Sequence, residues 1–410
     1  MIFACQKDSY LKNLKTTVVA CNPVVEGSAQ DGYEIIFDDT VLFPEGGGQP
    51  DDRGLVGDVP VLRVFRKDGK AVHIVESPIA VGAEVEMKVD WNRRYDHMQQ
   101  HSGQHLITAV AEKEFGFPTT SWSLGEDVSF IELDAPKGVK AEDVQKLESL
   151  VNEKIRQCLP LTVSLYEPGS EDLKAVRTRL KLPDGEGDVI RVVSIEGVDS
   201  NTCCGTHVSN LSHLQMIKLL YTEKGKQGKT NLYFLVGNRI LNYVDKTVRR
   251  EKAITTLLKC GPDDHASLIE KLNKSLKLAN KNSLSILRDL AVAEAKLLKQ
   301  QEPLPAFHTF HRREADAEFM AIFANELADK KVLLFLTGGD ERGSGQFLIS
   351  GPENIISAVG PKVCELLDGK GFLKHGKFQG KANALSKRNR VEELLKEVLT
   401  SDNKLITDQA

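Results

Sequence analysis

The sequence predicts an α+β protein built from successive parts, and three observations predict this class. Short β-rich segments fill residues 1–88, and strand-like segments mixed with amphipathic helical ones fill residues 89–246. A long run with helical apolar spacing occupies residues 247–303. Strand and helix patterns alternate again in residues 304–410. A chain of 410 residues is expected to form more than one domain, and we take these four ranges as the domain division.

Composition is that of an ordinary globular protein, with 41% apolar and 27% charged residues. The net charge of −4 excludes an overall basic field, so a nucleic-acid surface must be a local patch. The seven cysteines are odd in number and scattered, which predicts free thiols in a reducing compartment. Neither a leader pattern nor a membrane-length apolar run is evident, so we expect a cytosolic protein without a membrane partner.

The first part has the pattern of a small β-barrel or sandwich. Its β-branched and aromatic segments are short and are separated by Gly, Pro, Asn and Asp. The predicted strands are Thr16–Cys21, Tyr33–Phe37, Val61–Phe65, His73–Val75 and Glu84–Val89.

A glycine triplet, Gly46-Gly47-Gly48, followed by Gln49 and Pro50, interrupts this part. Three successive glycines cost chain entropy, which predicts positive φ angles or a close approach of the backbone to another group. A tight turn is the favoured interpretation, and a ligand-binding loop is the alternative. No Gly-Lys-Ser/Thr follows, so the segment is not a phosphate loop.

The second part predicts helices and strands in alternation. A helix is expected over 93–115 because apolar residues follow at helical spacing, and Gly116 is a typical C-terminal stop. A second amphipathic helix is expected over 141–158. The expected strands are 130–133, 161–166, 189–195, 214–221 and 230–236, with a hydroxyl-rich loop or edge strand at 119–123 and a basic loop at 224–229.

Two pairs of side chains in this part predict a metal site. His101 and His105 are four residues apart on the first helix, so both imidazoles lie on one helix face and can bind one ion. Cys203 and His207 repeat that spacing, and three imidazoles with one thiolate are a typical zinc set, one ion per chain. His97 precedes His101 by the same interval and is the alternative partner to His105.

The remaining chain predicts a helical arm and a separate α/β unit. Residues 238–302 are helical with a break at Gly261-Pro262, and an apolar seam predicts a coiled-coil-like hairpin or an arm for homodimer formation. The last part has helices at 316–327 and 354–367, and strands at 331–336 and 346–350. The glycine- and lysine-rich stretch 369–381 is interpreted either as a solvated loop or as a contact for a sugar-phosphate backbone.

Three motifs in this order resemble the freestanding alanyl-tRNA editing proteins of the AlaX group, which are related to the editing half of alanyl-tRNA synthetase. They are Gly46-Gly47-Gly48-Gln49-Pro50, His101-x-x-x-His105-Leu106 and Cys203-x-x-x-His207-Val208. The segment from Gly369 to the last helix resembles the glycine-rich C-terminal domain of that synthetase. The resemblance covers nearly the whole chain, as in the long form of the family.

The resemblance implies hydrolysis of the ester in Ser-tRNA(Ala), with Gly-tRNA(Ala) as a second candidate substrate and tRNA(Ala) as the partner. It makes His101, His105, Cys203 and His207 both the zinc ligands and the catalytic centre. Cys204 stands where the family usually has glycine and is the alternative thiol ligand, although the spacing favours Cys203.

The same resemblance implies a set of substrate-binding residues. The glycine loop would contact the terminal adenosine or the aminoacyl group. A serine-recognising side chain is expected among Thr119, Thr120 and Ser121, and Ser121 or Trp122 is the closest match by counting from His105. Arg191 and the basic loop are candidate phosphate contacts. The expected substrate-binding residues are Gly46, Gly47, Gly48, Gln49, Thr120, Ser121 and Arg191.

Two mechanisms and three functions stay open at this point. Zinc either lowers the pKa of a bound water to about 7, or only anchors the substrate while a separately positioned water attacks. The alternatives to an alanyl editor are a non-catalytic RNA-binding protein with structural zinc, and an editor of tRNA(Thr), because threonyl-tRNA synthetase has a related domain. A homodimer through the helical arm or the C-terminal part is the remaining expectation.

Overall fold

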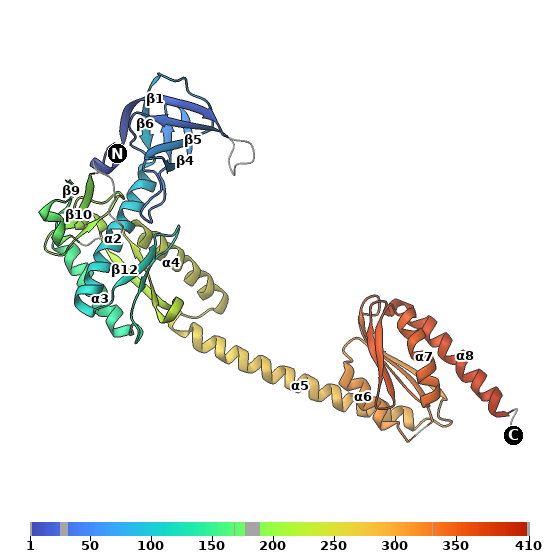
Figure 1. Ribbon diagram of the computed structural model, residues 1–410. Helices are drawn as coiled ribbons and strands as arrows, with labels where there is room; N and C mark the ends of the chain where they lie inside the picture. Colours follow the sequence, from blue (N-terminus) through green and yellow to red (C-terminus); the bar gives the residue numbers. More distant parts are fainter. Residues whose placement is uncertain (1, 25–31, 168, 177–188, 330, 408–410) are drawn as a thin grey trace. The chain divides into compact units, whose positions relative to one another are not determined.

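The computed structural model describes residues 2–24, 32–167, 169–176, 189–329 and 331–407 (Figure 1). It confirms the α+β class and divides the chain into two compact units, Met1–Ala253 and Ile254–Ala410. The finer division into four parts stays a prediction. Within the described ranges, no helix combines the length and apolarity needed to cross a membrane. All seven cysteines are free thiols, as their spacing predicted.

The first unit begins with a closed barrel, which confirms the barrel prediction. After the short helix α1 (Ala4–Lys7), six strands close in the order β1-β2-β5-β4-β3-β6, so no strand edge is left open. Inward side chains such as Val18, Ile35 and Met87 form one apolar core. The strands are β1 (Asn13–Pro23), β2 (Tyr33–Phe37), β3 (Gly54–Val56), β4 (Val59–Lys67), β5 (Lys70–Val75) and β6 (Glu84–Val89).

Helix α2 (Trp91–Phe115) follows the barrel directly and runs through the centre of the unit. It starts at Asp90, whose carboxylate accepts hydrogen bonds from the backbone N–H groups of Asn92 and Arg93. It ends at Gly116, whose φ of 66° is the left-handed cap expected from the sequence. Inside the helix, a Cβ on Gly103 would lie 2.5 Å from the side chain of Val236, so glycine permits close packing against a strand.

Two antiparallel sheets and a second helix enclose α2. One sheet has the order β12-β13-β8-β7 and the other β11-β10-β9, and both contribute to the apolar core that α2 shares with α3. Strand β7 is an edge strand, as the hydroxyl-rich segment predicted. The elements are β7 (Thr119–Ser123), β8 (Ser129–Leu133), α3 (Ala141–Arg156), β9 (Leu161–Tyr166), β10 (Ile190–Ile195), β11 (Asp199–Thr202), β12 (Ile217–Lys224) and β13 (Thr230–Val236).

The helical arm is confirmed as two helices, α4 (Asn238–Leu258) and α5 (His265–Lys299), with the break at Gly261-Pro262. Several leucines of the predicted seam, including Leu272 and Leu276, are exposed along α5. The C-terminal end of α5 is buried through Ala291, Ala295 and Leu298 against α6 (Ala317–Glu326). Homodimer formation through the exposed part stays a prediction.

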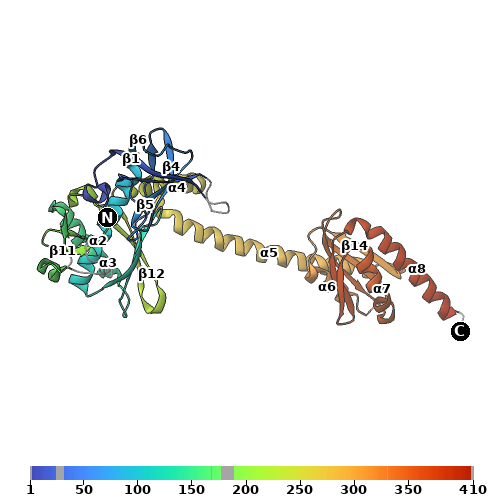
Figure 2. The same cartoon turned by 45° about the horizontal axis from the view of Figure 1, so that its top comes forward.

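The second unit is a five-stranded sheet with helices on both faces (Figure 2). Its order is β14-β15-β16-β18-β17, parallel between β14 and β15 and antiparallel elsewhere. Alternate residues of β15 face opposite cores, Phe335 toward α7 and α8 and Leu334 toward α5 and α6. The further elements are β14 (Phe307–Arg312), β15 (Leu333–Gly339), β16 (Gly345–Ser350), α7 (Glu353–Leu366), β17 (Lys370–Lys374), β18 (Lys377–Ala382) and α8 (Arg388–Thr407).

Two features of this unit differ from the sequence-based expectation. The stretch 369–381 is a β-hairpin, so its interpretation as a solvated loop is wrong. Gly371 and Gly380 pair across the two strands, and Phe378 fills the core against Gly360 of α7, where a Cβ would collide with its ring. Strand β14 was not predicted, because His308, His311 and Arg312 break the apolar pattern of a buried strand.

A buried ion pair joins the barrel to α2. Arg94 and Asp52 are each fully buried, and Nε of Arg94 donates to Oδ2 of Asp52 over 2.8 Å. Arg94 also donates to the carbonyl of Ser9 over 3.0 Å, and Asp52 accepts from the backbone N–H of Phe43 over 2.7 Å. The pair therefore attaches the loop after residue 43 to the start of the helix.

Replacing Arg94 with methionine would leave the Asp52 carboxylate buried without its cation. We expect the Arg94→Met variant to lose about 3–5 kcal/mol of unfolding free energy. Urea unfolding followed by tryptophan fluorescence measures this, because both tryptophans, Trp91 and Trp122, lie in the first unit. The matched control is Arg156→Met, which breaks an exposed pair with Glu153 and should leave the urea midpoint close to that of wild type. Equal midpoints for the two variants would contradict the role of the buried pair.

Candidate metal centre

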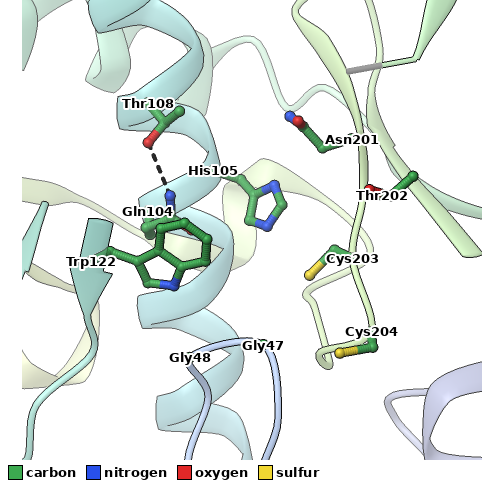
Figure 3. A pocket seen from close by; sticks show the side chains of 10 residues that line it. All are labelled: Gly47, Gly48, Gln104, His105, Thr108, Trp122, Asn201, Thr202, Cys203 and Cys204. Carbon is green, nitrogen blue, oxygen red and sulfur yellow. Dashed lines mark hydrogen bonds between the residues drawn. The ribbon is translucent and has the colours of Figure 1, made fainter. Parts of the chain in front are cut away.

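The two predicted ligand pairs converge on one point. Helix α2 presents His101 and His105 one turn apart, and the turn after β11 presents Cys203 and His207. The ligating atoms of these four side chains all lie within 4.8 Å of one another. Figure 3 shows His105 and Cys203 facing each other from the helix and the turn. His97 is not among the clustered side chains, so the alternative pairing of His101 with His97 is wrong.

The distances in this cluster suit one tetrahedral metal ion. Sγ of Cys203 lies 3.5 Å from Nε2 of His101 and 3.3 Å from Nε2 of His207. Tetrahedral zinc, with Zn–N near 2.0–2.1 Å and Zn–S near 2.3 Å, would separate these atoms by about 3.5 Å. With four protein ligands directed at one point, a tetrahedral ion would have no coordination position left for water or substrate.

Burial sets the protonation of the ligands. It lowers the pKa of His101 and of His207 well below the usual value, so both imidazoles are neutral, which is the form that binds a metal. Burial, with a smaller contribution from Cys204, raises the pKa of the Cys203 thiol to about 12. A cation in the cluster would offset this by stabilising the thiolate, so metal binding would release the thiol proton.

Hydrogen bonds from other segments orient two of the imidazoles. Nδ1 of His101 donates to Oε1 of Gln49 over 2.8 Å, which leaves Nε2 of His101 for the ion. Gln49 is itself held by Thr206, whose backbone N–H donates to Oε1 and whose hydroxyl accepts from Nε2. Nδ1 of His207 lies 3.2 Å from the Ser102 hydroxyl, so its Nε2 is directed at Cys203.

The turn that carries Cys203 is fixed by two buried side chains. Arg191 donates from Nη1 to the carbonyl of Cys203 over 2.6 Å and from Nε to the carbonyl of Gln6 over 2.9 Å. The Gln6 side chain donates to the carbonyl of Cys204 over 2.7 Å. Gly205 follows, and a Cβ there would collide with the His101 ring. The close approach of the turn to α2 therefore depends on glycine at this position.

A cavity of about 180 Å³ adjoins the cluster on the side of His105 and Cys203 (Figure 3). One wall is the turn 47–48 of the glycine triplet, where Gly47 and Gly48 have φ of 60° and 77°. Backbone hydrogen bonds between Gly46 and Gln49 close this turn, which confirms the predicted tight turn. The lining residues are Gly47, Gly48, Gln104, His105, Thr108, Trp122, Asn201, Thr202, Cys203 and Cys204.

The predicted substrate-binding residues occupy different places. Gly47 and Gly48 line the cavity, and Gly46 lies in the same turn. Gln49 lies beneath the cluster and orients His101. Thr120 and Ser121 are exposed, and the Thr120 hydroxyl donates to the carboxylate of Glu132 over 2.6 Å. Arg191 is 6% exposed, and its guanidinium donates to the carbonyl of Cys203. The phosphate contact predicted for Arg191 stays a prediction.

The sequence patterns missed several residues of this site. Gln6, Gln104 and Thr108 belong to no motif that indicates a ligand or a catalytic group. Only one signal pointed to Gln104: it directly precedes a metal-ligand candidate on a helix. Cys204 lines the cavity but is not in the ligand cluster, which agrees with the spacing that favoured Cys203.

A family model and a solved structure each match part of this chain. The family model described as "Threonyl and Alanyl tRNA synthetase second additional domain" matches residues 190–233, which contain Cys203 and His207. A solved structure, the C-Ala domain of alanyl-tRNA synthetase from Aquifex aeolicus, matches with 24% identity and a TM-score of 0.21. That match covers 23% of this chain and 89% of that chain.

Curated relatives match along almost the whole length. Alanyl-tRNA editing protein Aarsd1-B of Xenopus laevis is 52% identical, with 98% of each chain covered. Alanyl-tRNA editing protein Aarsd1 of Mus musculus is 51% identical over 98% of this chain and 99% of the relative. Alanyl-tRNA editing protein AlaX-L of Pyrococcus horikoshii is 29% identical over 67% of each. With about half of its residues identical to such relatives from end to end, this chain belongs to the family of alanyl-tRNA editing proteins.

Proposed function

We propose that the chain is a trans-editing hydrolase that cleaves the ester of tRNA(Ala) mischarged with serine, with Gly-tRNA(Ala) as a second substrate. The observation that carries this proposal is the cavity beside four convergent metal ligands, in a chain whose relatives are named alanyl-tRNA editing proteins. The physical need for such an enzyme is clear. A synthetase pocket for alanine rejects an analogue that merely adds a hydroxyl by only about a hundredfold.

Zinc is the ion that we assign to the cluster, one per chain, because three imidazoles and one thiolate suit it best. Bound there, zinc would supply positive charge for an ester carbonyl or for an attacking water. The chain's own residues supply the rest. His105 and Cys203 belong to both the cluster and the cavity wall, and Trp122 contributes an aromatic side chain to that wall.

Binding of the tRNA body needs basic surfaces outside this site, since the net charge is −4. The hairpin β17–β18 carries Lys370, Lys374, Lys377 and Lys381, and Phe372 on it is 57% exposed. We assign this hairpin to contact with the phosphate backbone and with an unstacked base. The exposed leucines of α5 favour a homodimer through that helix.

The direct test is the release of labelled serine from Ser-tRNA(Ala) beside release of alanine from Ala-tRNA(Ala). We expect serine to be released at least a hundredfold faster, because only serine offers a hydroxyl to the polar groups of the cavity. Ser-tRNA(Thr) is the comparison substrate. Preferential hydrolysis of the tRNA(Thr) ester would replace the proposal by an editor of tRNA(Thr). Failure to hydrolyse any of the esters, with tRNA bound, would favour the RNA-binding alternative.

Removing the thiolate ligand tests the metal assignment. We expect the Cys203→Ala variant to lose zinc and to release serine at least about a hundredfold more slowly, because three imidazoles alone bind the ion more weakly. The adjacent Cys204→Ala variant is the matched control and should keep stoichiometric zinc. We would measure two quantities for both variants: the zinc content, by mass spectrometry of the intact protein, and the rate of serine release. Loss of zinc from the Cys204 variant alone would reverse the assignment of the thiol ligand.

A further inference from the structure

A line of three polar side chains runs along α2 and ends at the cavity. Nε2 of Gln104 donates to the hydroxyl of Thr108 over 2.9 Å, and this hydroxyl lies 2.9 Å from that of Thr119 on β7. Figure 3 shows the first of these bonds. Gln104, Thr108 and Thr119 are 2%, 2% and 8% exposed. The amide of Gln104 is therefore held in a fixed position at the cavity wall.

The oxygen of this amide makes no hydrogen bond within the described residues. Oε1 of Gln104 is buried and has no hydrogen-bond partner among the residues that the structure describes; we call it the open carbonyl. Native proteins pair nearly all buried polar atoms, so an exception at a cavity indicates a missing ligand group. Gln104 directly precedes the metal ligand His105, and both line the same cavity. The open carbonyl thus belongs to a residue of the cavity wall that is next in sequence to a ligand candidate.

We propose that Gln104 recognises the side-chain hydroxyl of the aminoacyl group, with the open carbonyl accepting the hydrogen bond. This inference rests on the proposed editing function. Serine pairs the carbonyl, whereas alanine places a methyl group beside it and leaves it buried without a partner. The penalty falls on the correctly charged tRNA, which is the discrimination that an editing site needs.

The orientation of the amide follows from its hydrogen bond, because Nε2 donates to the Thr108 hydroxyl and Oε1 is the atom left without a partner in the described part of the chain. Trp122 adds a second group. Its indole Nε1 is also buried and, within the described ranges, finds no hydrogen-bond partner. Both residues line the cavity, and a hydroxyl can both donate and accept.

The rival residues on β7 do not meet these conditions. Thr120 and Ser121 are exposed, neither lines the cavity, and the Thr120 hydroxyl already donates to Glu132. Ser121 pairs with Glu132 across the sheet, whereas Trp122 pairs with the buried Ile131. Ser121 therefore lies on the outer face of the sheet and Trp122 on the inner face. We therefore assign recognition of the substrate hydroxyl to Gln104 on α2 and not to Thr120 or Ser121 on β7.

The test compares Gln104→Met with wild type in the full, zinc-loaded chain. Methionine keeps the length of the side chain but removes its hydrogen-bonding end. The first readout is the ratio of kcat/KM for Ser-tRNA(Ala) to that for Ala-tRNA(Ala), and we expect it to fall about 10- to 100-fold. The second is calorimetric binding of amide-linked 3′-seryl and 3′-alanyl adenosine, which cannot be hydrolysed. The preference for the seryl compound should fall by the same factor.

Further variants keep the result interpretable. Gln104→Glu retains an acceptor and should keep the seryl preference, even if Gln104→Met proves too unstable to use. Gln145→Met makes the same change at an exposed position of α3 and should behave as wild type. Ser121→Ala tests the rival residue directly. Zinc content and urea midpoints of all variants show whether the site is intact.

Each outcome decides the matter. A Gln104→Met variant that contains zinc and keeps the wild-type preference overturns the inference, as does a preference lost in Ser121→Ala but not in Gln104→Met. Equal binding of both adenosine compounds by wild type overturns it as well. A seryl preference in binding that Gln104→Met abolishes, in a protein that hydrolyses neither ester, supports Gln104 as the recognising residue and rejects the hydrolase.

Discussion

The structure of the first unit depends on the attachment of the barrel loop 43–53 to helix α2. Asp52 meets Arg94 in a fully buried ion pair, and Gln49 accepts a hydrogen bond from His101. Buried charges are stable only with their partners, so the loop cannot leave the helix without a large cost. Among the described residues of the barrel none belongs to the four-membered cluster, yet the barrel sets the tautomer and direction of His101. It is part of the metal centre for this reason.

The same attachment positions the cavity. The glycine triplet directly precedes Gln49 in the loop between β2 and β3. Its backbone approaches the side chain of Trp122 closely because Gly48 has no Cβ. On the other side, Gly205 allows the Cys203 turn to approach the His101 ring. Glycine at both places lets three distant segments meet around a small volume. The cavity walls therefore combine the backbone of the glycine turn with side chains from α2, β7 and the Cys203 turn.

Chemistry and selection are assigned to adjacent residues of one helix. His101 and His105 face the cluster, and Gln104 faces the cavity from the next position along the helix. The hydrogen bonds of Gln104 to Thr108 and onward to Thr119 are separate from those that orient His101 and His207, which come from Gln49 and Ser102. Two independent networks allow a change in one to leave the other intact. A substrate group can thus be recognised without disturbing the ion.

The sequence by itself determined the four His and Cys side chains that cluster, the helix that carries two of them, the barrel strands and the helical arm. These features depend on local spacing: residues four apart share a helix face, and alternation or helical periodicity defines an element. Only the tertiary structure shows the hydrogen bonds of Gln49, Arg191 and Gln104, and that residues 369–381, one interpretation of which was a solvated loop, form a hairpin. Each of these outcomes depends on which distant segment a side chain or strand meets. Such contacts produce no periodic pattern in a single sequence, because the sequence does not distinguish a buried glutamine or arginine from an exposed one.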